Sequence, residues 1–295
     1  MDDNDRRLAE RFEEHRSHLR AVAYRMLGSL READDAVQET WLRASRAGTD
    51  DVENLGGWLT TIAGRVCLNM LRSGRTRREE PLDVHVPDPI VSRPDGVDPE
   101  QEALLSDSVG LALLVVLDTL APAERLAFVL HDMFAVPFDD IAPIVGRSAA
   151  ATRQLASRGR RRVQDADPMP DADVTRQREV VDAFFAASRK GDFEALVAVL
   201  DPDILLRTDD GGTLPEVAAL VQGAEAVAGQ ALMFAHRSPF LRPVLVNGAA
   251  GVVVAPEGRA IAVMAFTVRD GRVARIDVLA DPERLNRLDL SALGT

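Results

Sequence analysis

The first 78 residues carry apolar side chains at the spacing of amphipathic helices. In a first helix they recur at Leu8, Phe12, Leu19, Val22, Ala23 and Met26. Gly28-Ser29 breaks this pattern, a second helix is predicted over about 32–44, and residues 50–57 are predicted to form a loop. A long third helix is expected to begin near Gly57.

Proline interrupts the helical pattern after this third helix. Residues 79–100 contain many acids and prolines at positions 81, 87, 89, 94 and 99. This composition predicts an extended, solvated linker over 81–100. A compact helical unit is expected over 101–164, followed by a second, short linker over 165–171.

Beyond residue 171 the pattern changes to helices followed by strands. Amphipathic helices are predicted over 174–190 and 192–200, and pieces rich in Val, Leu and Ile follow at 204–207, 243–246, 251–255, 260–269 and 272–280. Asp270-Gly271 separates two alternating runs, which is a strong hairpin signal. We therefore predict a multi-domain chain, with all-α domains at 1–80 and 101–164 and an α+β domain at 172–295.

The net charge of −12 argues against nucleic-acid binding only as an average. Residues 79–118 hold ten acids and one arginine, whereas residues 147–162 hold six arginines and no acid. Because the local field decides what a surface binds, a basic segment of this kind can still contact DNA.

Cysteine content and hydropathy predict a cytoplasmic protein. The single cysteine, Cys67, excludes an internal disulfide and a cysteine-based zinc cluster, as expected in a reducing compartment. The acidic N-terminus does not resemble a signal peptide, and the longest apolar stretch, residues 109–117, is too short to cross a bilayer. We expect no membrane anchor.

A helix-turn-helix is predicted over residues 138–162. Gly146 suits the turn, Ser148 suits the N-cap of the second helix, and a buried seam is expected at Thr152, Ala156, Gly159 and Val163. The DNA-binding candidates on this helix are Arg147, Ser148, Arg153, Gln154, Ser157, Arg158 and Arg161. The alternatives are a solvated charged helix end and an unrelated helical hairpin. Pro143, inside the first helix, is a mark against ideal geometry.

Two further helical faces carry candidate chemistry. The helix from Trp58 pairs an apolar stripe, with Cys67 among core positions, with a polar face suited to single-stranded nucleic acid. Its candidates are Trp58, Thr61, Arg65, Asn69, Arg72, Arg75, Arg77 and Arg78. The second helix gathers Asp34, Asp35, Gln38 and Glu39 on one side, which suits a basic protein surface. An ordinary solvated face is the alternative for both.

These three stretches, in this order, resemble regions 2 and 4 of extracytoplasmic-function sigma factors, group IV of the sigma-70 family. The resemblance implies that residues 33–42, including Trp41, bind the β′ clamp of core RNA polymerase, and that residues 58–72 melt and read the −10 element. It implies that residues 120–163 read the −35 element and sit on the β flap, while the acidic linker threads through the polymerase. Many family members have Asn at Arg65 and Arg at Leu155, so the promoter sequence is not carried over.

Residues 172–295 resemble the SnoaL-like, NTF2-like extension of the SigJ-like subgroup, a conical cup. That subgroup carries Trp-Leu-Pro-Glu-Pro, DGGGK-like and NPDKL-like segments. We match these to residues 166–170, 210–214 and 281–285, respectively. The expected regulatory residues are Pro168, Pro170, Asp210, Gly211, Gly212, Asp281, Pro282 and Leu285. The resemblance implies that this extension modulates sigma activity in cis.

The cup itself carries polar candidates for a small-molecule ligand: His236, Arg237, Asp209, Asp210 and Asp277. We find no metal-ligand spacing and no nucleophile–base pair, so we expect neither an enzyme nor a cofactor. Two rival interpretations are a ligand-sensing one-component regulator, which binds its operator without polymerase, and a polyketide-cyclase or isomerase-like enzyme with a DNA-binding appendage. The enzyme predicts a deep pocket holding a carboxylate of raised pKa.

Overall fold

A computed structural model describes residues 3–47, 52–75, 85–94, 110–166, 170–213 and 217–293. The chain falls into two compact units, which are described separately. The first comprises Met1–Glu80, Pro99–Asp107 and Val116–Asp167, and the second comprises Pro81–Asp98, Ser108–Val115 and Pro168–Thr295. Helix α5 (Leu111–Thr119) carries residues of both units.

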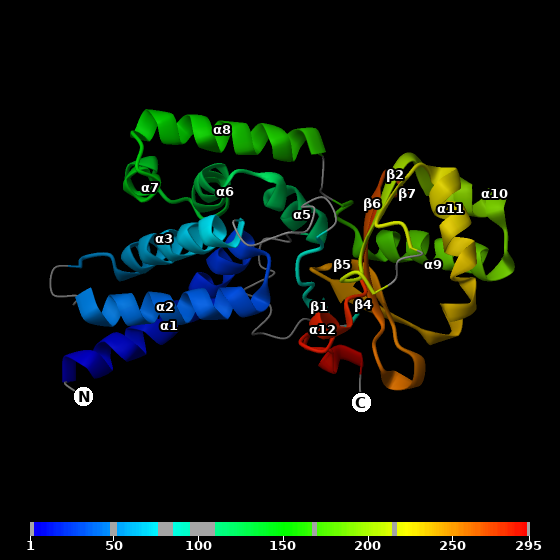
Figure 1. Ribbon diagram of the computed structural model, residues 1–295, viewed down its shortest axis with the longest axis horizontal. Coiled ribbons are helices and arrows are strands. Elements are labelled where there is room, and N and C mark those ends of the chain that lie inside the picture. The colour runs from blue at the N-terminus through cyan, green and yellow to red at the C-terminus, as the bar shows by residue number, and fades with distance from the viewer. Residues whose placement is uncertain are drawn as a thin grey trace. The chain divides into compact units, whose positions relative to one another are not determined.

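Three helices form the first part of unit 1: α1 (Asp3–Leu27), α2 (Leu30–Ala47) and α3 (Leu55–Arg75) (Figure 1). Their common core includes Phe12, Leu19, Val37 and Leu59, which confirms the predicted helical pattern. The first helix ends where Gly28 adopts a positive φ of 73° and donates its N–H to Tyr24 O at 2.8 Å. A side chain at this backbone conformation would be strained, so glycine sets the helix boundary.

The second part of unit 1 contains α6 (Pro122–Phe128), a π-helical turn η1 (Val129–Met133), α7 (Phe138–Val145) and α8 (Ala149–Ala166). Helices α6 and α7 also pack against α3. A Cβ added to Gly64 of α3 would lie 3.0 Å from Leu130 Cδ1 and 3.4 Å from Leu126 Cδ1. Helix α3 is therefore buried on a second face, at Thr60, Gly64 and Leu68, which the single predicted stripe did not include, while the burial of Cys67 agrees with its predicted core position.

Unit 2 is built on one seven-stranded sheet of order β1-β4-β5-β6-β7-β2-β3. The strands are β1 (Val91–Ser92), β2 (Leu200–Asp209), β3 (Leu220–Gln222), β4 (Leu241–Val246), β5 (Ala249–Val254), β6 (Ala262–Arg269) and β7 (Arg272–Leu279). All neighbours pair antiparallel except β2 and β7, which are parallel. The five predicted strand pieces correspond to β2, β4, β5, β6 and β7.

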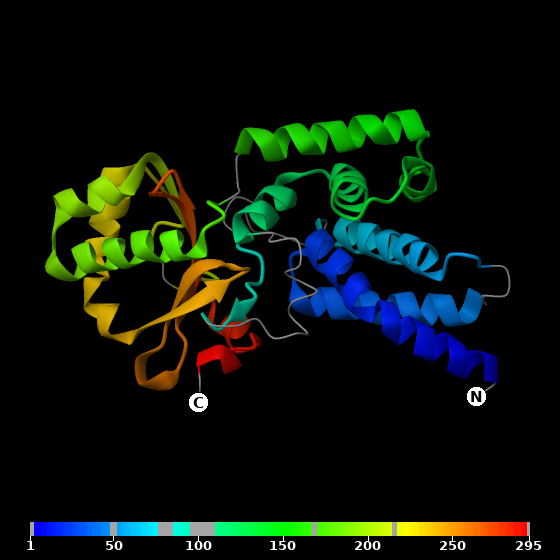
Figure 2. The same ribbon diagram turned by 180° about the vertical axis from the view of Figure 1, so that it is seen from behind.

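Helices α9 (Val174–Lys190), α10 (Phe193–Val199) and α11 (Ala224–Met233) pack against one face of this sheet (Figures 1 and 2). The core between them includes Phe184, Leu196, Val227, Phe266 and Ile276. Short helical turns complete the unit: η2 (Ala235–Phe240), η3 (Pro256–Gly258), α12 (Pro282–Leu285) and η4 (Ser291–Leu293). This α+β arrangement confirms the predicted fold class of the C-terminal domain.

Two tight hairpins set the register of the sheet. Asp270 and Gly271 have φ values of 51° and 73°, as a type I′ turn requires, which confirms the predicted hairpin. Asn247 and Gly248, with φ values of 50° and 78°, form an equivalent turn between β4 and β5. The Asn-Gly dipeptide carries the same hairpin signal in the sequence and would have located this second turn.

The linker predicted over 81–100 is extended, but its described part is not solvated. Val86, Ile90, Val91 and Ser92 are all buried in unit 2. Residues 91–92 form β1, the edge strand that pairs with β4. The prediction of solvation was wrong, because composition reports only local preference. A segment about 150 positions later in the chain provides the sheet edge that buries these residues. No described helix is long and apolar enough to span a membrane.

Cys67 provides a chemical test of this packing. Its side chain is fully buried in α3, and burial raises the pKa of the thiol to about 12, although the charge of Arg125 opposes the rise. At pH ~8 the thiolate fraction should then be roughly a thousandfold below that of a free thiol. We expect labelling by a disulfide reagent only after denaturation, measured by thiol absorbance; full labelling of the native protein would contradict this packing.

Candidate nucleic-acid interface and the Arg284 network

The second helix of the predicted helix-turn-helix is α8, and its local geometry agrees with the sequence. Gly146 ends α7 in the left-handed conformation, and Ser148 Oγ accepts a hydrogen bond from Ala151 N at 3.3 Å. Thr152, Ala156 and Gly159 are buried, which confirms three positions of the predicted seam, and Val163 is half-buried. A Cβ on Gly159 would lie 3.0 Å from Phe128 Cβ, so glycine permits the close approach of α6 and α8.

The candidate DNA-binding side chains of α8 and its turn lie mainly on the surface. Six of them are exposed and Ser157 is half-buried; the exposed ones are Arg147, Ser148, Arg153, Gln154, Arg158 and Arg161. Three arginines of this helix face acids: Arg160 forms an ion pair with Asp132, and the exposed Arg158 lies 3.8 Å from a carboxylate oxygen of Glu124. Arg162 lies 3.5 Å from a carboxylate oxygen of Glu124. The helix thus presents an exposed row of cationic and amide donors.

The polar face predicted for α3 is also on the surface. Arg65, Asn69 and Arg72 are exposed, and Thr61 is half-buried with its hydroxyl donating to Gly57 O at 2.9 Å. Trp58 is half-buried against the core of α1–α3. The side chain of Arg75 and all of Arg77 and Arg78 lie outside what the structure describes.

The acidic side of α2 separates into exposed and paired groups. Asp35 and Gln38 are exposed, whereas Asp34 forms an ion pair with Arg20 at 2.6 Å and Glu39 with Arg43 at 2.7 Å. Trp41, expected among the docking residues, packs edge-to-face on Phe12 with ring centroids 5.1 Å apart. Its ring is therefore largely a core group, because a large aromatic side chain gains more from this contact than from water.

Two C-terminal motif segments meet in unit 2. Gly211 and Gly212 have φ values of 62° and 76°, and a Cβ on Gly211 would lie 2.9 Å from the Asp281 carboxyl carbon. Asp281 caps α12 by accepting from the backbone N–H groups of Glu283 and Arg284, at 2.8 and 3.2 Å. The Asp-Gly-Gly turn and the Asp-Pro-Glu-Arg-Leu segment are therefore one packed structure, in which glycine is required by the close approach.

Arg284 lies at the centre of a hydrogen-bond network that the sequence analysis missed. Its guanidinium donates to Asp209 Oδ2, to Asp88 Oδ1 and to Val86 O, each at 2.6 Å. His85 Nδ1 lies 3.3 Å from Asp209 Oδ2, which also accepts from Val86 N at 2.9 Å. We call these groups, Arg284, Asp209, Asp88, His85 and the Val86 backbone, the Arg284 network.

This network includes a second candidate for the linker motif. Asp88, which lies between Pro87 and Pro89, accepts a hydrogen bond from Arg284 of the 281–285 motif. The segment proposed from the sequence, residues 166–170, lacks the acid; Pro168 lies outside the described residues, and Pro170 precedes Asp171, which hydrogen-bonds to the β6–β7 hairpin. The acid between two prolines is the sequence signal that could have identified this second candidate.

The linker is also held at the opposite sheet edge. Asn247 Oδ1 accepts from Ile90 N at 3.0 Å, and Asn247 N donates to Ile90 O at 2.8 Å. Arg178 of α9 donates to Pro94 O at 2.7 Å. Residues 85–94 are thus held by backbone pairing and by two arginines, as an added strand would be.

A separate pocket of about 120 Å³ opens on the helical face of the sheet. Of the cup candidates, only Arg237 is among the described residues that line it. His236 is exposed, while Asp209 belongs to the Arg284 network and Asp210 to the glycine turn. Asp277 points to the other face of the sheet, where its carboxylate lies 3.2 Å from Arg207.

The Asp277 carboxyl has the raised pKa that the enzyme interpretation requires, but this carboxyl does not line the pocket. Complete burial raises this pKa, although the guanidiniums of Arg207 and Arg275 oppose the rise. It is a buried ion-pair group remote from the pocket lining. Within the described ranges, no three His, Cys, Asp or Glu side chains gather where they could hold a metal ion.

Comparisons with known proteins agree with this arrangement. Residues 11–78 match the family model for Sigma-70 region 2, and residues 110–163 match that for Sigma-70, region 4. The chain is 39% identical over 287 residues to the ECF RNA polymerase sigma factor SigJ of Mycobacterium tuberculosis, covering 92% of this chain and 91% of that protein. This chain belongs to the extracytoplasmic-function sigma factors.

One further relative and one solved structure cover nearly the whole sigma factor. A probable ECF sigma factor, SigI of M. tuberculosis, is 35% identical, with 93% of each chain covered. The crystal structure of M. tuberculosis SigJ matches with a TM-score of 0.76 and 34% identity, covering 96% of this chain and 99% of that one. The two helical sigma domains and the C-terminal NTF2-like domain are therefore shared along the whole length.

Replacing Arg284 should release the linker of this sigma factor. Arg284→Gln removes the charge that Asp88 and Asp209 share, so we expect amide exchange at Val86 and Ile90 to accelerate roughly tenfold or more. Hydrogen exchange measured by mass spectrometry tests this. Arg287→Gln, an exposed arginine three residues later, is the matched control. Equal protection in both variants would contradict the assigned role of Arg284.

Acid should release the linker as well. Burial by itself raises the pKa of Asp209, but hydrogen bonds from His85 and Val86 and the charge of Arg284 together lower it below its ordinary value. Because the pKa of Asp209 is lower in the network than in the unfolded chain, the ionised carboxylate stabilises the network fully above pH ~4. This stabilisation is lost as the pH falls through the lowered pKa. We expect linker protection, corrected for intrinsic exchange, to fall only below pH ~4. Asp209→Asn should abolish this acid dependence; a loss near neutrality would exclude Asp209 as its cause.

Proposed function

We propose that this sigma factor uses α8, α3 and α2 as three separate surfaces: for the −35 duplex, for the −10 element and for core RNA polymerase. Family membership establishes promoter-specific transcription initiation, and the three surfaces are our assignment within it. The observation that carries the assignment is the exposed Arg153, Gln154 and Arg158 on the second helix of a helix-turn-helix. Such a helix fits the major groove, where arginine and glutamine recognise base edges.

The exposed face of α3 supports a role at the −10 element. Arg65, Asn69 and Arg72 lie along one helix side, with Thr61 at its start. In such a row, the hydrogen-bonding groups can contact bases that have left the duplex. The cationic groups can contact the phosphates between those bases. We assign Trp58 a supporting role in the core behind this face, because its ring packs with Leu59 and its neighbours.

For polymerase we propose that Asp35 and Gln38 of α2 dock on the β′ clamp, since they are exposed and unlike Trp41 need no repacking. We expect region 4 to sit on the β flap and the acidic linker to follow the basic channel near the RNA exit path. The protein would then act in the cytoplasm, where the polymerase is.

Promoter binding requires unit 1 to open. The −35 and −10 elements are about 25 base pairs apart, which is roughly 80 Å along B-form DNA at 3.4 Å per pair. In the free protein α3 packs on α6 and α7, and α6 packs on α8, so the two DNA-reading helices belong to one packed unit. We propose that polymerase separates them by breaking the contact of Gly64 with Leu126 and Leu130.

The C-terminal domain would modulate activity in cis by retaining the linker. The segment that we expect to thread through polymerase is the one held in the Arg284 network and paired with β4. The same residues cannot thread through polymerase and remain bound in the Arg284 network at the same time. We therefore propose that the Arg284 network inhibits initiation until the linker leaves the sheet.

In vitro transcription with core polymerase tests the DNA-reading surface. We expect Arg153→Ala/Arg158→Ala to lower promoter-dependent transcripts by about 30-fold or more, since each of the two lost base or phosphate contacts costs roughly 1–3 kcal/mol. Arg189→Ala, an exposed arginine of α9, controls for charge. Specific duplex binding without polymerase would instead favour the one-component regulator.

The same assay tests inhibition in cis. We expect Arg284→Gln to raise transcription at least threefold over the unmodified chain, because the linker then leaves the sheet at lower cost, and Arg287→Gln to leave it unchanged. Lower activity in Arg284→Gln, with linker exchange accelerated, would mean that linker retention activates rather than inhibits.

A further inference from the structure

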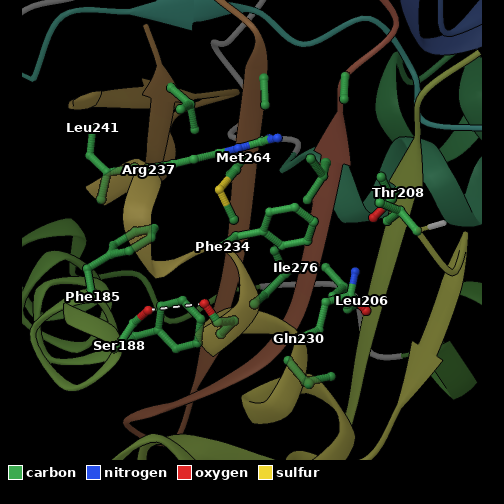
Figure 3. A pocket seen from close by; sticks show the side chains of 18 residues that line it. Phe185, Ser188, Leu206, Thr208, Gln230, Phe234, Arg237, Leu241, Met264 and Ile276 are labelled. Carbon is green, nitrogen blue, oxygen red and sulfur yellow. Dashed lines mark hydrogen bonds between the residues drawn. The ribbon is translucent and has the colours of Figure 1, made fainter. Parts of the chain in front are cut away.

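The pocket of unit 2 has an apolar body. It lies between the sheet and helices α9 and α11, and its wall is formed largely by Phe184, Phe185, Leu206, Phe234, Met264 and Ile276 (Figure 3). Its volume, about 120 Å³, is close to that of engineered apolar cavities of about 150 Å³ that accept benzene. The apolar part of an occupant is thus about one six-membered ring or a short branched chain.

The polar groups of the pocket select the charge of its occupant. Ser188 is already committed, since its hydroxyl donates to Ala231 O at 3.3 Å, while Gln230 and Thr208 add neutral groups. Arg237 is the charged side chain among the described lining residues, and no described lining residue is an acid. Its guanidinium carbon lies 4.8 Å from the centre of the Phe234 ring, which holds the charge at the edge of the apolar wall.

We propose that this pocket binds a small apolar monocarboxylate, with its hydrocarbon body among the phenylalanines and its carboxylate on Arg237. A guanidinium at the border of a water-poor pocket favours an anion, because a carboxylate can accept two parallel hydrogen bonds there. A cation would meet like charge with no compensating acid.

The site is one residue away from the Arg284 network at Asp209, and it also adjoins the cap of the helix that carries Arg284. Thr208 lines the pocket, and Asp209, the next residue of β2, points to the opposite face and accepts from Arg284. Ala280 lines the pocket, and Asp281 caps the helix that carries Arg284. Arg237 and Ala280 also border a second hollow whose wall includes Pro282 and Leu285 of α12. Ligand binding would therefore act on the end of β2, which carries Asp209, and on the segment that leads from β7 to Arg284.

This coupling rests on the proposed retention of the linker, whereas the ligand site does not. Calorimetric titration of the full-length chain with benzoate, benzamide and benzylamine tests the site alone. We expect benzoate to bind at least tenfold more tightly than neutral benzamide, and benzylamine not to bind. Arg237→Met should bring benzoate to the benzamide level, while Arg242→Met, an exposed arginine of β4, should bind as the unmodified chain does.

Several outcomes would overturn the assignment. Equal affinity for the three probes, or full benzoate affinity in Arg237→Met, would exclude anion recognition by Arg237. Absence of any binding at millimolar concentration would exclude the site for this class. Ala231→Phe should block both benzoate and benzamide by filling the pocket, provided that circular dichroism shows it folded; the Arg237→Met result stands independently.

Hydrogen exchange of residues 85–94 separates the site from its coupling. We expect saturating benzoate to change this exchange at least threefold in the unmodified chain and to leave it unchanged in Arg237→Met. If benzoate binds without changing the exchange of residues 85–94, the proposed ligand site stands and its proposed coupling to the linker is wrong. If Arg284→Gln also failed to alter linker exchange, the proposed retention itself would be wrong, whatever binds in the pocket.

Discussion

The guanidinium of Arg284 holds together segments that lie almost 200 positions apart in the chain. It donates to Asp88 and to Val86 O in the linker and to Asp209 at the end of β2. The three side chains are largely buried, with exposed fractions of 16, 15 and 10%. Removing the cation from such a group leaves two carboxylates close together and poorly hydrated, a change that typically costs roughly 3–5 kcal/mol. The position of the linker therefore depends on one side chain far more than on its own composition.

The sheet of unit 2 separates two kinds of chemistry. Because successive residues of a strand point to opposite faces, Thr208 and Asp209 belong to different environments despite being neighbours. One face, covered by α9 and α11, is apolar and encloses the pocket. The other face carries the Arg207–Asp277 pair and the Arg284 network. The strand β2 therefore carries residues of the pocket and of the Arg284 network on its two faces.

The basic side chains of unit 1 are concentrated on particular helices, which would allow a protein of net negative charge to contact DNA. Arg65 and Arg72 of α3 and Arg153 and Arg161 of α8 are exposed, whereas the other arginines within α8 form ion pairs with Glu124 or Asp132. The overall charge of −12 opposes association of the free protein with DNA. Dependence on a polymerase that supplies additional DNA contacts follows from this balance, and the packing of α3 on α6 and α7 adds a second reason for it.

The sequence by itself determined the elements whose cause is local. Apolar periodicity placed the helices, Gly146 and Ser148 placed the helix-turn-helix, and Asp270-Gly271 placed a hairpin, because backbone conformation and capping act within a few residues. The exposed face of α3 and the recognition side of α8 also followed from spacing. Only the tertiary structure decided that Trp41 packs partly against the core, that Asp277 points to the sheet face opposite the pocket and that residues 91–92 add a strand to the sheet. These outcomes depend on contacts between distant segments, and neither composition nor periodicity contains information about which distant segment provides the partner.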